Sequence, residues 1–334
     1  MLLLERGKLP RQRVCGEFVS AESLDLLAAL LGHGEDGEAI RISEARLFVD
    51  GRVISTPVSP AAASIARFDL DADLWAAAKS SGVDARMECA VENVVGTGPF
   101  GIQTSLGTFT SRAVVCAAGR WSNLTPKSDH NGSALEKWLG IKAHFAEESP
   151  HPSVDLYFFK GGYCGVQPVR LGDDRQGRVN ACAMVRADVA RTLAEVFQLS
   201  WELAERSRAW KPLMEATSTS PLIFHKPRPM QDGMLLAGDA AAFVDPFVGD
   251  GISLALRSGA MATECLVPFF KGEQSLVDAM EVYALAYRNH LAPVFRNSSR
   301  IRGLLRLPAP MRRPLVGLLA RAPQVTQYLV SSTR

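Results

Sequence analysis

The stretch GMLLAGDAAAFVDPFVGDGISLALRSG, residues 233–259, decides how this chain folds. Residues 234–237 form a short apolar run that ends at Gly238-Asp239. A proline, two closely spaced glycines and the start of a helical pattern follow at Pro246, Gly249, Gly251 and Ile252. Apolar runs, glycines and prolines in this order predict a strand, a turn and a helix.

The same residues suit a ligand site. An acid at the end of a strand accepts hydrogen bonds from sugar or polyol hydroxyls. Glycines at a helix start let a ligand approach bare backbone N–H groups, where the helix dipole favours negative charge. An ordinary βα connection with a surface loop is the alternative. The concentration of Gly-Asp, Pro and Gly-x-Gly favours the ligand site.

Composition indicates a folded globular protein. The chain has 334 residues, of which 47% are hydrophobic and 22% charged, enough for one large domain or two interleaved ones. The net charge of +2 gives no general case for nucleic acid. Six cysteines form no CxxC pair or metal-type cluster with histidine, so we expect no metal site and a reduced, cytoplasmic setting. We find no signal peptide and no apolar run as long as a membrane span.

The first residues predict a strand that ends in an acid, Leu2-Leu3-Leu4-Glu5. Either Glu5 is a simple strand-end charge, or the chain lacks a preceding strand, glycine loop and helix. Residues 6–20 follow as a basic loop that suits either a pyrophosphate or solvent, and Ser20 is a candidate helix cap.

Further along, residues 45–56 predict a hairpin with its turn at Asp50-Gly51. A helix is expected over 70–80, and 113–117 predicts a fully apolar strand of a buried parallel sheet. Four strands are expected within 139–186, mostly antiparallel, then a helix over 188–210 and a short strand at 222–224. After Gly251 the pattern is helical, broken into short helices by the prolines at 308, 310, 314 and 323.

Together these segments resemble FAD-dependent oxidoreductases of the geranylgeranyl-reductase and p-hydroxybenzoate-hydroxylase-like superfamily, over roughly residues 1–260. Four motifs occur in the family's order: residues 3–5, residues 10–16, residues 114–122, and Gly238-Asp239 with the proline and glycines up to Ile252. The last of these is the most specific.

The resemblance implies an FAD site. Glu5 would bind the adenosine ribose, Asp239 the ribityl hydroxyls, and the backbone around Gly249 and Gly251 would face the flavin ring. Arg67 would lie near the pyrophosphate. The cofactor-binding residues implied are Glu5, Arg13, Cys15, Gly16, Arg67, Gly119, Gly238, Asp239, Pro246, Gly249, Asp250, Gly251 and Ile252.

The resemblance also places residues 161–168 on a strand facing the flavin and the substrate. Tyr163, Gly165 and Pro168 would line the substrate pocket, with plain sheet packing as the alternative. Candidate catalytic groups are Cys15 and Tyr163, although Cys15 also fits a small buried thiol without a redox role. No acid–base pair at a telling spacing is present in the sequence, and His225 is expected in a loop.

Three features depart from the family. The glycine loop G-x-G-x-x-G is absent, which corresponds to roughly 25–30 residues of a first βαβ unit. Ala118-Gly119 stands where many members have Asp-Gly, an acid linked to nicotinamide handling. No halogenase tryptophan motif or matching catalytic lysine segment occurs, which disfavours chlorination.

The predicted fold is therefore α/β, with a Rossmann-like FAD-binding domain that is N-terminally incomplete. The domain comprises residues 1–40, 62–138 and 222–270. An inserted, mainly antiparallel β-sheet domain for the substrate comprises 41–61 and 139–221, and 271–334 is a helical C-terminal region.

The predicted function is that of an FAD-dependent oxidoreductase or monooxygenase using NAD(P)H. It would reduce an alkene or hydroxylate an apolar or carrier-bound substrate; the alternative is a truncated, non-catalytic remnant of such a flavoprotein. Residues 282–334 contain nine arginines and no acid. This basic region predicts either peripheral contact with an anionic membrane or a helical lid.

Overall fold

The computed structural model describes residues 1–32, 39–121, 124, 137–172, 177–222, 224, 226–305 and 307–321. The strands are β1 (Leu2–Leu4), β2 (Phe18–Val19), β3 (Ile40–Val49), β4 (Arg52–Ser64), β5 (Asp84–Arg86), β6 (Val91–Val95), β7 (Phe100–Thr104), β8 (Gly107–Ser111), β9 (Val115–Cys116), β10 (Trp138–Ala146), β11 (Ser153–Phe159), β12 (Gly162–Pro168), β13 (Arg178–Arg186), β14 (Lys211–Pro212), β15 (Thr217–Thr219), β16 (Met230–Gln231) and β17 (Met234–Leu236).

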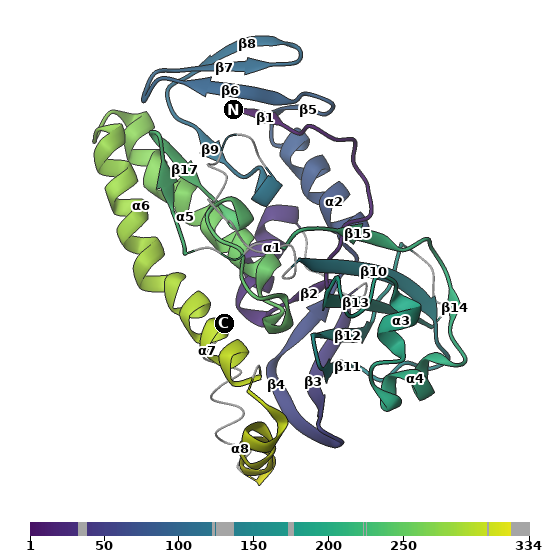
Figure 1. Cartoon of the computed structure of the whole chain (residues 1–334). Coiled ribbons are helices and arrows are strands. Elements are labelled where there is room, and N and C mark those ends of the chain that lie inside the picture. The colour runs from purple at the N-terminus through teal and green to yellow at the C-terminus, as the bar shows by residue number, and fades with distance from the viewer. Residues whose placement is uncertain are drawn as a thin grey trace.

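The helices are α1 (Leu24–Leu31), α2 (Arg67–Ser80), α3 (Leu193–Phe197), α4 (Trp201–Ser207), α5 (Gly251–Lys271), α6 (Leu276–His290), α7 (Ala292–Leu305) and α8 (Ala309–Arg321). Short 3-10 turns are η1 (Ala21–Ser23), η2 (Gly119–Trp121), η4 (Gly238–Ala240) and η5 (Pro246–Val248). The predicted α/β class is confirmed, with helices and several sheets in one molecule (Figure 1).

A large, mainly antiparallel sheet fills one side of the molecule. Its strand order is β14-β10-β13-β12-β11-β3-β4-β2, with β15 also pairing with β10, and only β11 and β3 run parallel within it. Side chains alternate between its two faces. On one face Ile141, Ala143 and Phe145 of β10 pack with α3 and α4; those two helices cover that face in Figure 1. The four strands predicted within 139–186 are confirmed as β10 to β13.

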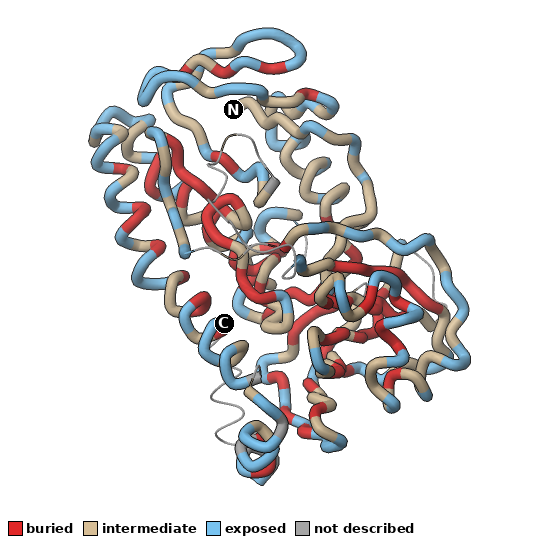
Figure 2. The backbone as a smooth tube through the Cα atoms, viewed as in Figure 1, coloured by how far each residue is buried: buried red, intermediate tan, exposed pale blue. Residues whose placement is uncertain are grey.

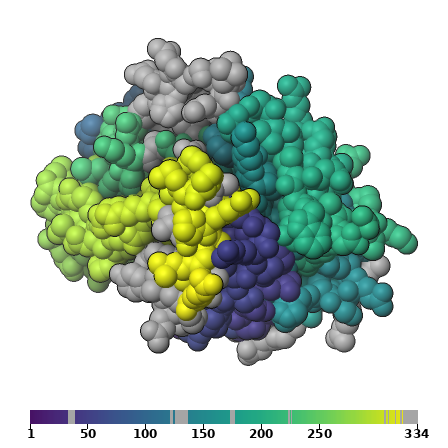
Figure 3. Space-filling model, turned by 60° about the horizontal axis from the view of Figure 1, so that its bottom comes forward, coloured from purple at the N-terminus to yellow at the C-terminus, as the bar shows by residue number. Residues whose placement is uncertain are grey.

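The predicted hairpin at Asp50-Gly51 is also confirmed. It joins β3 to β4, and both turn residues have positive φ, 52° and 74°. Such a pair of left-handed residues matches the right-handed twist of the two strands. The tip of the hairpin is bound by α8, where Arg312 donates to both Asp50 carboxylate oxygens at 2.9 and 2.6 Å. Figure 3 shows α8 lying against this hairpin.

The rest of the molecule contains two short parallel pairs. β1 pairs with β5, and β9 pairs with β17. An antiparallel sheet of β6, β7 and β8 lies beside them at one end (Figure 1). Leu4 of β1 packs into the same apolar cluster as Cys116 of β9 and Leu236 of β17. Both pairs therefore contribute to one core, which α5 and α6 cover.

Two helices enclose that core. Leu254 and Leu266 of α5 and Tyr283 of α6 lie in it, and Ser275 caps α6 with a reciprocal Ser275–Asp278 capping box. Figure 2 shows the buried backbone concentrated in the β17–α5 connection and in the large sheet, while the outer side of α6 is exposed. Val282 and Leu285 on that outer side are 50% and 54% exposed.

Several expectations are corrected. The strand predicted over 113–117 is only Val115–Cys116, and Val115 is 40% exposed because β17 is its only partner among the described strands. The helix predicted over 188–210 is two short helices: Thr192 caps the first through its side chain, and the extended backbone at Ser200 separates the second from it. Among the described residues of 222–224 no strand is present. Pro314 lies inside α8 and does not end it.

Within the part of the chain that the structure describes, no helix is both long enough and apolar enough to span a bilayer. The halves of the predicted substrate domain, 41–61 and 139–221, meet in the large sheet, which β2 and the end of β4 extend beyond those limits. The proposed domain limits themselves stay a prediction.

We predict that Tyr283→Phe destabilises the fold by about 1–2 kcal/mol. The fully buried Tyr283 hydroxyl donates to the Leu236 carbonyl of β17 at 2.7 Å, and its loss leaves that buried acceptor without this donor. Urea unfolding followed by circular dichroism measures the change. Leu285→Ala on the exposed side of the same helix is the control, expected within about 0.5 kcal/mol of wild type. Equal stabilities for Tyr283→Phe and wild type would contradict the assignment.

Candidate functional site

The turn after β17 is built as the sequence pattern predicts. Gly238 has a φ of 58°. Its N–H donates a hydrogen bond to the Ser258 hydroxyl of α5 at 2.9 Å. A Cβ at Gly238 would lie 3.2 Å from the Ala255 Cβ, so the turn packs closely on the helix. Asp239 follows with a side chain that is 39% exposed, and the Arg120 guanidinium lies 4.0 Å from it. The acid is therefore held at the strand end and faces partly outward.

A second turn leads into α5. The Asp245 carboxylate accepts a hydrogen bond from the Phe247 N–H at 3.5 Å, and Gly249 has a φ of 76°. A Cβ at Gly249 would lie 3.0 Å from the Phe18 ring, so this glycine allows β2 to approach. Helix α5 then begins at Gly251 and runs for 21 residues. A turn that contains glycines therefore leads directly into the N-terminus of the helix.

The segment around Cys15-Gly16 is joined to that helix start. Ser20 donates its hydroxyl to the buried Asp250 carboxylate at 2.7 Å, and its N–H donates to the Ser253 hydroxyl at 3.2 Å. Ile252 packs with Val19 in one apolar cluster. The structure thus brings together two motifs that are more than 230 residues apart.

Three of the predicted glycines face open space. A Cβ built at Gly16, Gly119 or Gly251 meets no atom within 4 Å. Gly16 lies on the segment joined to α5, Gly119 opens η2 beside η4, and Gly251 is the first residue of α5. The space beside the backbone on the Cβ side is therefore open at these positions. The structure brings Cys15, Gly16, Asp250, Gly251 and Ile252 to one place.

The predicted pyrophosphate-binding residues are paired with carboxylates. Arg13 contacts Asp71 at 2.9 Å and Glu5 at 3.6 Å, and Arg67 contacts Asp71 at 2.7 Å. Glu5 also accepts from the Gly7 N–H at 2.7 Å and from Arg11 at 3.1 Å. Burial alone would lower the pKa of Arg67, but the Cys15 and Asp71 groups outweigh it and raise that pKa. These arginines keep their charge, and Asp71 and Glu5 offset it.

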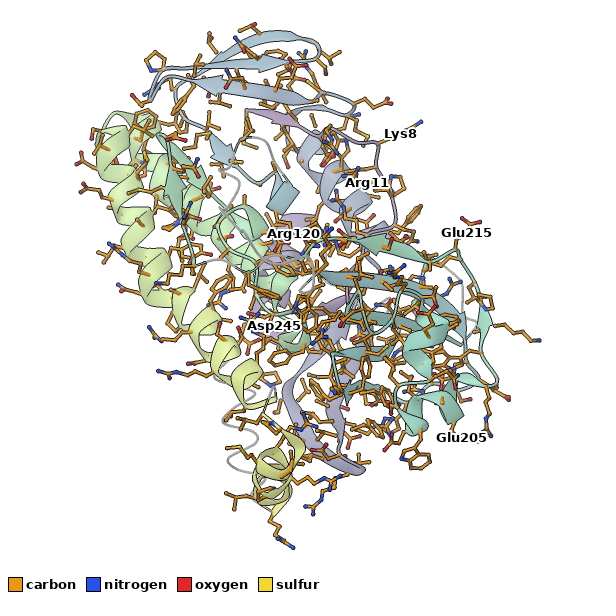
Figure 4. The ribbon with its side chains drawn as sticks, viewed as in Figure 1. Lys8, Arg11, Arg120, Glu205, Glu215 and Asp245 are labelled. Carbon is orange, nitrogen blue, oxygen red and sulfur yellow. The ribbon has the colours of Figure 1, made fainter. Side chains whose placement is uncertain are left out.

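Figure 4 shows charged side chains in two places. Lys8 and Arg11 lie on the outer loop, whereas Arg120 and Asp245 lie between the helical part and the large sheet. Burial lowers the pKa of Arg120, against the raising effect of Asp239. The guanidinium of Arg120 stacks on the Phe243 ring at 4.2 Å. It is the cation that accompanies Asp239.

The predicted pocket residues do not gather at one point. Tyr163 is buried against Phe158 and Phe247, with ring centroids 5.8 and 6.1 Å away, and its burial raises the pKa of its hydroxyl. Gly165 lies on the same strand face, where a Cβ would meet Leu156 at 3.4 Å. Pro168 ends β12 on the opposite face, about 16 Å from Tyr163 along the strand. Only Tyr163 belongs to the aromatic group.

That aromatic group was not predicted. Buried Tyr163, Met184 and Leu222 are packed with partly buried rings, and the rings are Trp138, Phe158, Phe224, Phe243 and Phe247. Arg302 of α7 stacks on Phe224 at 4.1 Å and lies 3.4 Å from the Asp245 carboxylate. The residues come from strands, from the turn after β17 and from α7, so sequence order gives no signal for their meeting.

A buried acid–base cluster was also not predicted from the sequence. Glu17, Lys142 and His144 are all fully buried, with Lys142 Nζ 2.5 Å and His144 Nε2 2.8 Å from the Glu17 carboxylate. They are 125 and 127 residues apart in the chain, which hid the pairing. The available signal was a Lys and a His two positions apart in an otherwise apolar strand, Ile141 to Phe145.

Some expectations lie outside this site. Ser122 and His225 lie outside the described residues, as do Arg306 and Arg334 of the basic tail. Arg302 and Arg312 of that tail contact Asp245 and Asp50. Membrane contact stays a prediction, as do the cofactor, pocket and catalytic roles given to individual residues. Among the described residues, no group of three or more His, Cys, Asp or Glu side chains is placed to hold a metal.

No protein-family model matches the chain. Among characterised proteins, it is 23% identical over 304 residues to conditioned medium factor receptor 1 of Dictyostelium discoideum, which covers 80% of this chain and 58% of that protein. It is 24% identical over 156 residues to digeranylgeranylglycerophospholipid reductase 2 of Methanopyrus kandleri, or 45% of this chain and 38% of the reductase. The chain therefore spans about half the length of these relatives or less.

Solved structures match over nearly the whole chain. A geranylgeranyl bacteriochlorophyll reductase-like protein of Thermoplasma acidophilum superposes with a TM-score of 0.75 at 17% identity, covering 99% of this chain and 88% of that one. The flavin-dependent brominase Bmp2 superposes with a TM-score of 0.74 at 16% identity, covering 99% and 86%. At these identities the likeness establishes the fold, and the expectation against chlorination stays a prediction. The resemblance inferred from the four motifs is confirmed: this chain has the α/β fold of the flavin-dependent halogenases and geranylgeranyl reductase-like proteins.

Proposed function

We propose that the chain binds FAD and acts as an FAD-dependent oxidoreductase that takes electrons from NAD(P)H. Its substrate is an apolar or carrier-bound molecule, which it reduces at an alkene or hydroxylates. The observation that carries the proposal is the group of open glycines, Gly16, Gly119 and Gly251, around the N-terminus of α5 and beside Asp239. The similarity to a flavin-dependent brominase supports a flavin as the class of cofactor.

The residues present suit the flavin part of FAD. The first turn of α5 offers backbone N–H groups at the positive end of a 21-residue helix, which favours negative charge. Gly251 adds no side chain between these groups and a ligand. FAD supplies hydride transfer or oxygen chemistry when bound, and the reduced ring is negatively charged. The helix start would hold and orient that ring.

Asp239 and Arg120 suit the polyol and phosphate part. The Asp239 carboxylate is partly exposed, and a carboxylate can accept hydrogen bonds from ligand hydroxyls. The partly buried Arg120 guanidinium lies beside it. An ionised acid and a cation 4.0 Å apart give two chemically distinct contacts for one extended ligand. This arrangement supports the assignment of Asp239 to the cofactor.

The aromatic group around Tyr163 supports an apolar substrate. Phe224 and Phe243 stack with their centroids 5.2 Å apart, and Phe158, Tyr163 and Phe247 contact one another edge-on or tilted. Aromatic side chains of this kind offer large apolar contact areas. They lie between the large sheet and α7, next to the turn that leads into α5. An apolar substrate placed here would meet the flavin side of the site.

The direct test is the visible spectrum of the purified full chain. We expect flavin absorbance, a melting temperature that rises with added FAD, and loss of that absorbance on anaerobic addition of NADPH or NADH. A chain without bound flavin whose melting temperature is unmoved by FAD would overturn the proposal. Flavin that binds but is reduced only by dithionite would leave FAD binding standing and remove NAD(P)H.

A steric test uses two glycines of the same helix. We predict that Gly251→Ala weakens FAD binding about tenfold or more, a loss of about 1.4 kcal/mol, because the new methyl group lies where the ring would approach. The free protein has room for it, so its stability should not fall. Gly259→Ala, also with open space around its Cβ, is the matched control. Equal FAD affinity in both variants by fluorescence titration would place the ligand elsewhere.

Asp239→Ala tests the polyol contact. We expect FAD affinity to fall about tenfold or more while the melting temperature of the ligand-free chain changes little, because the side chain is 39% exposed. Calorimetric titration with FAD measures the affinity. Glu264→Ala, an exposed acid on α5, controls for the loss of one negative charge. An unchanged dissociation constant for Asp239→Ala would remove this residue from the site.

A further inference from the structure

A polar clamp of four buried side chains projects from one face of the large sheet. It consists of Lys142 and His144 of β10, Asn180 of β13 and Gln167 of β12. His144 is directly opposite Asn180, and Asn180 is opposite Gln167, so the three share a face, and Lys142 shares it through the two-residue period of β10. The other face carries the apolar contacts with α3 and α4. Four polar groups on one inner face require partners there.

Every member of the polar clamp binds the segment 12–17. Asn180 donates to the Cys15 carbonyl at 2.9 Å, and Gln167 donates to the Glu17 carbonyl at 3.0 Å. Lys142 donates to the Glu17 carboxylate at 2.5 Å and to the Gln12 side chain at 3.0 Å. His144 contacts the second Glu17 carboxylate oxygen at 2.8 Å. The sheet thus holds this segment by both its backbone and its side chains.

Glu17 is the centre of these contacts. Its φ is 61°, a left-handed conformation that a non-glycine residue adopts at a cost. Its carboxylate also accepts from the Arg67 N–H at the start of α2, at 3.0 Å. Gly16, immediately before it, faces open space. Glu17 therefore points back into the polar clamp while the Cys15-Gly16 backbone faces the proposed cofactor site.

Glu17 and Lys142 form a buried ion pair. Burial alone would raise the pKa of Glu17, but the hydrogen bond from His144 and the charge of Lys142 outweigh it and hold that pKa below its ordinary value. Glu17 is therefore an anion, and the Lys142 side chain contacts it at 2.5 Å. Both are fully buried, so water screens neither charge from its surroundings. Removing one partner leaves a single buried charge, whereas removing both is neutral or stabilising in comparable pairs.

We propose that Glu17 and Lys142 are positioning residues that set the reduction potential of the bound flavin by offsetting each other's charge behind the Cys15-Gly16 backbone. The inference rests on the proposed function. Reduction adds two electrons and one proton to the flavin, as a hydride from NAD(P)H, and leaves the ring negative. An uncompensated Glu17 opposes that charge, and an uncompensated Lys142 favours it.

The test measures the midpoint potential of bound FAD by anaerobic dye equilibration in the full chain. Lys142→Met should move the potential to a more negative value, and Glu17→Gln to a more positive one. The double variant, which removes the charges of both Glu17 and Lys142, should return close to wild type. A purely structural role would weaken FAD binding in both single variants without shifts of opposite sign, and would overturn the proposal.

Asp155→Asn is the matched control. Asp155 is also a buried acid of this sheet, paired with Arg46 and Arg206, but it lies on the face toward α4. The Asp155→Asn substitution should lower the stability of the fold and leave the midpoint potential of bound FAD unchanged. If a single variant does not fold, the double variant and wild type still decide: a large difference between their potentials overturns charge balance. Wild-type protein that binds no FAD would instead overturn the proposed function.

Discussion

The hydrogen bonds that join Ser20 to Asp250 and Ser253 are the contact on which the candidate site depends. Ser20 follows β2, which pairs with β4 of the large sheet, while Asp250 precedes α5. The contact is buried on both sides, so neither polar group has water as an alternative partner. It brings the open Gly16 backbone to the positive end of α5. Without it the sheet and the helix would carry two separate half-sites.

The sequence predicts those turns and strands that are determined by residues close together in the chain. The turn at Gly238-Asp239, the hairpin at Asp50-Gly51 and the strands β10 to β13 depend on residues close together in the chain. The strand predicted over 113–117 is present as β9 but is shorter and more exposed than expected. An apolar run does not reveal how many neighbours a strand has, and β9 has β17 on one side only among the described strands. Likewise, the late helix start after Thr192 and the break at Ser200 depend on extended backbone at these two residues, which periodicity does not report.

The candidate site divides in the same way. Its glycines and Asp239 are recognisable because special backbone residues are rare and clustered. The pairing of Glu17 with Lys142 and His144 joins residues 125 and 127 positions apart, which no local pattern specifies. From its charge alone, the basic loop suits either a pyrophosphate or solvent. Tertiary structure adds Asp71, which bonds to Arg13 and Arg67.

Charge compensation also ties the C-terminal helices to the turn after β17. Arg302 of α7 stacks on Phe224, Phe224 stacks on Phe243, and Phe243 stacks on Arg120. Each arginine at the ends of this series lies beside an acid of the 233–259 stretch, Asp245 or Asp239. A cation on each outer ring face favours the stack by cation–π attraction. The stretch that begins the FAD proposal thus also anchors α7, and any ligand that contacts Asp239 acts on a series that extends to the aromatic group.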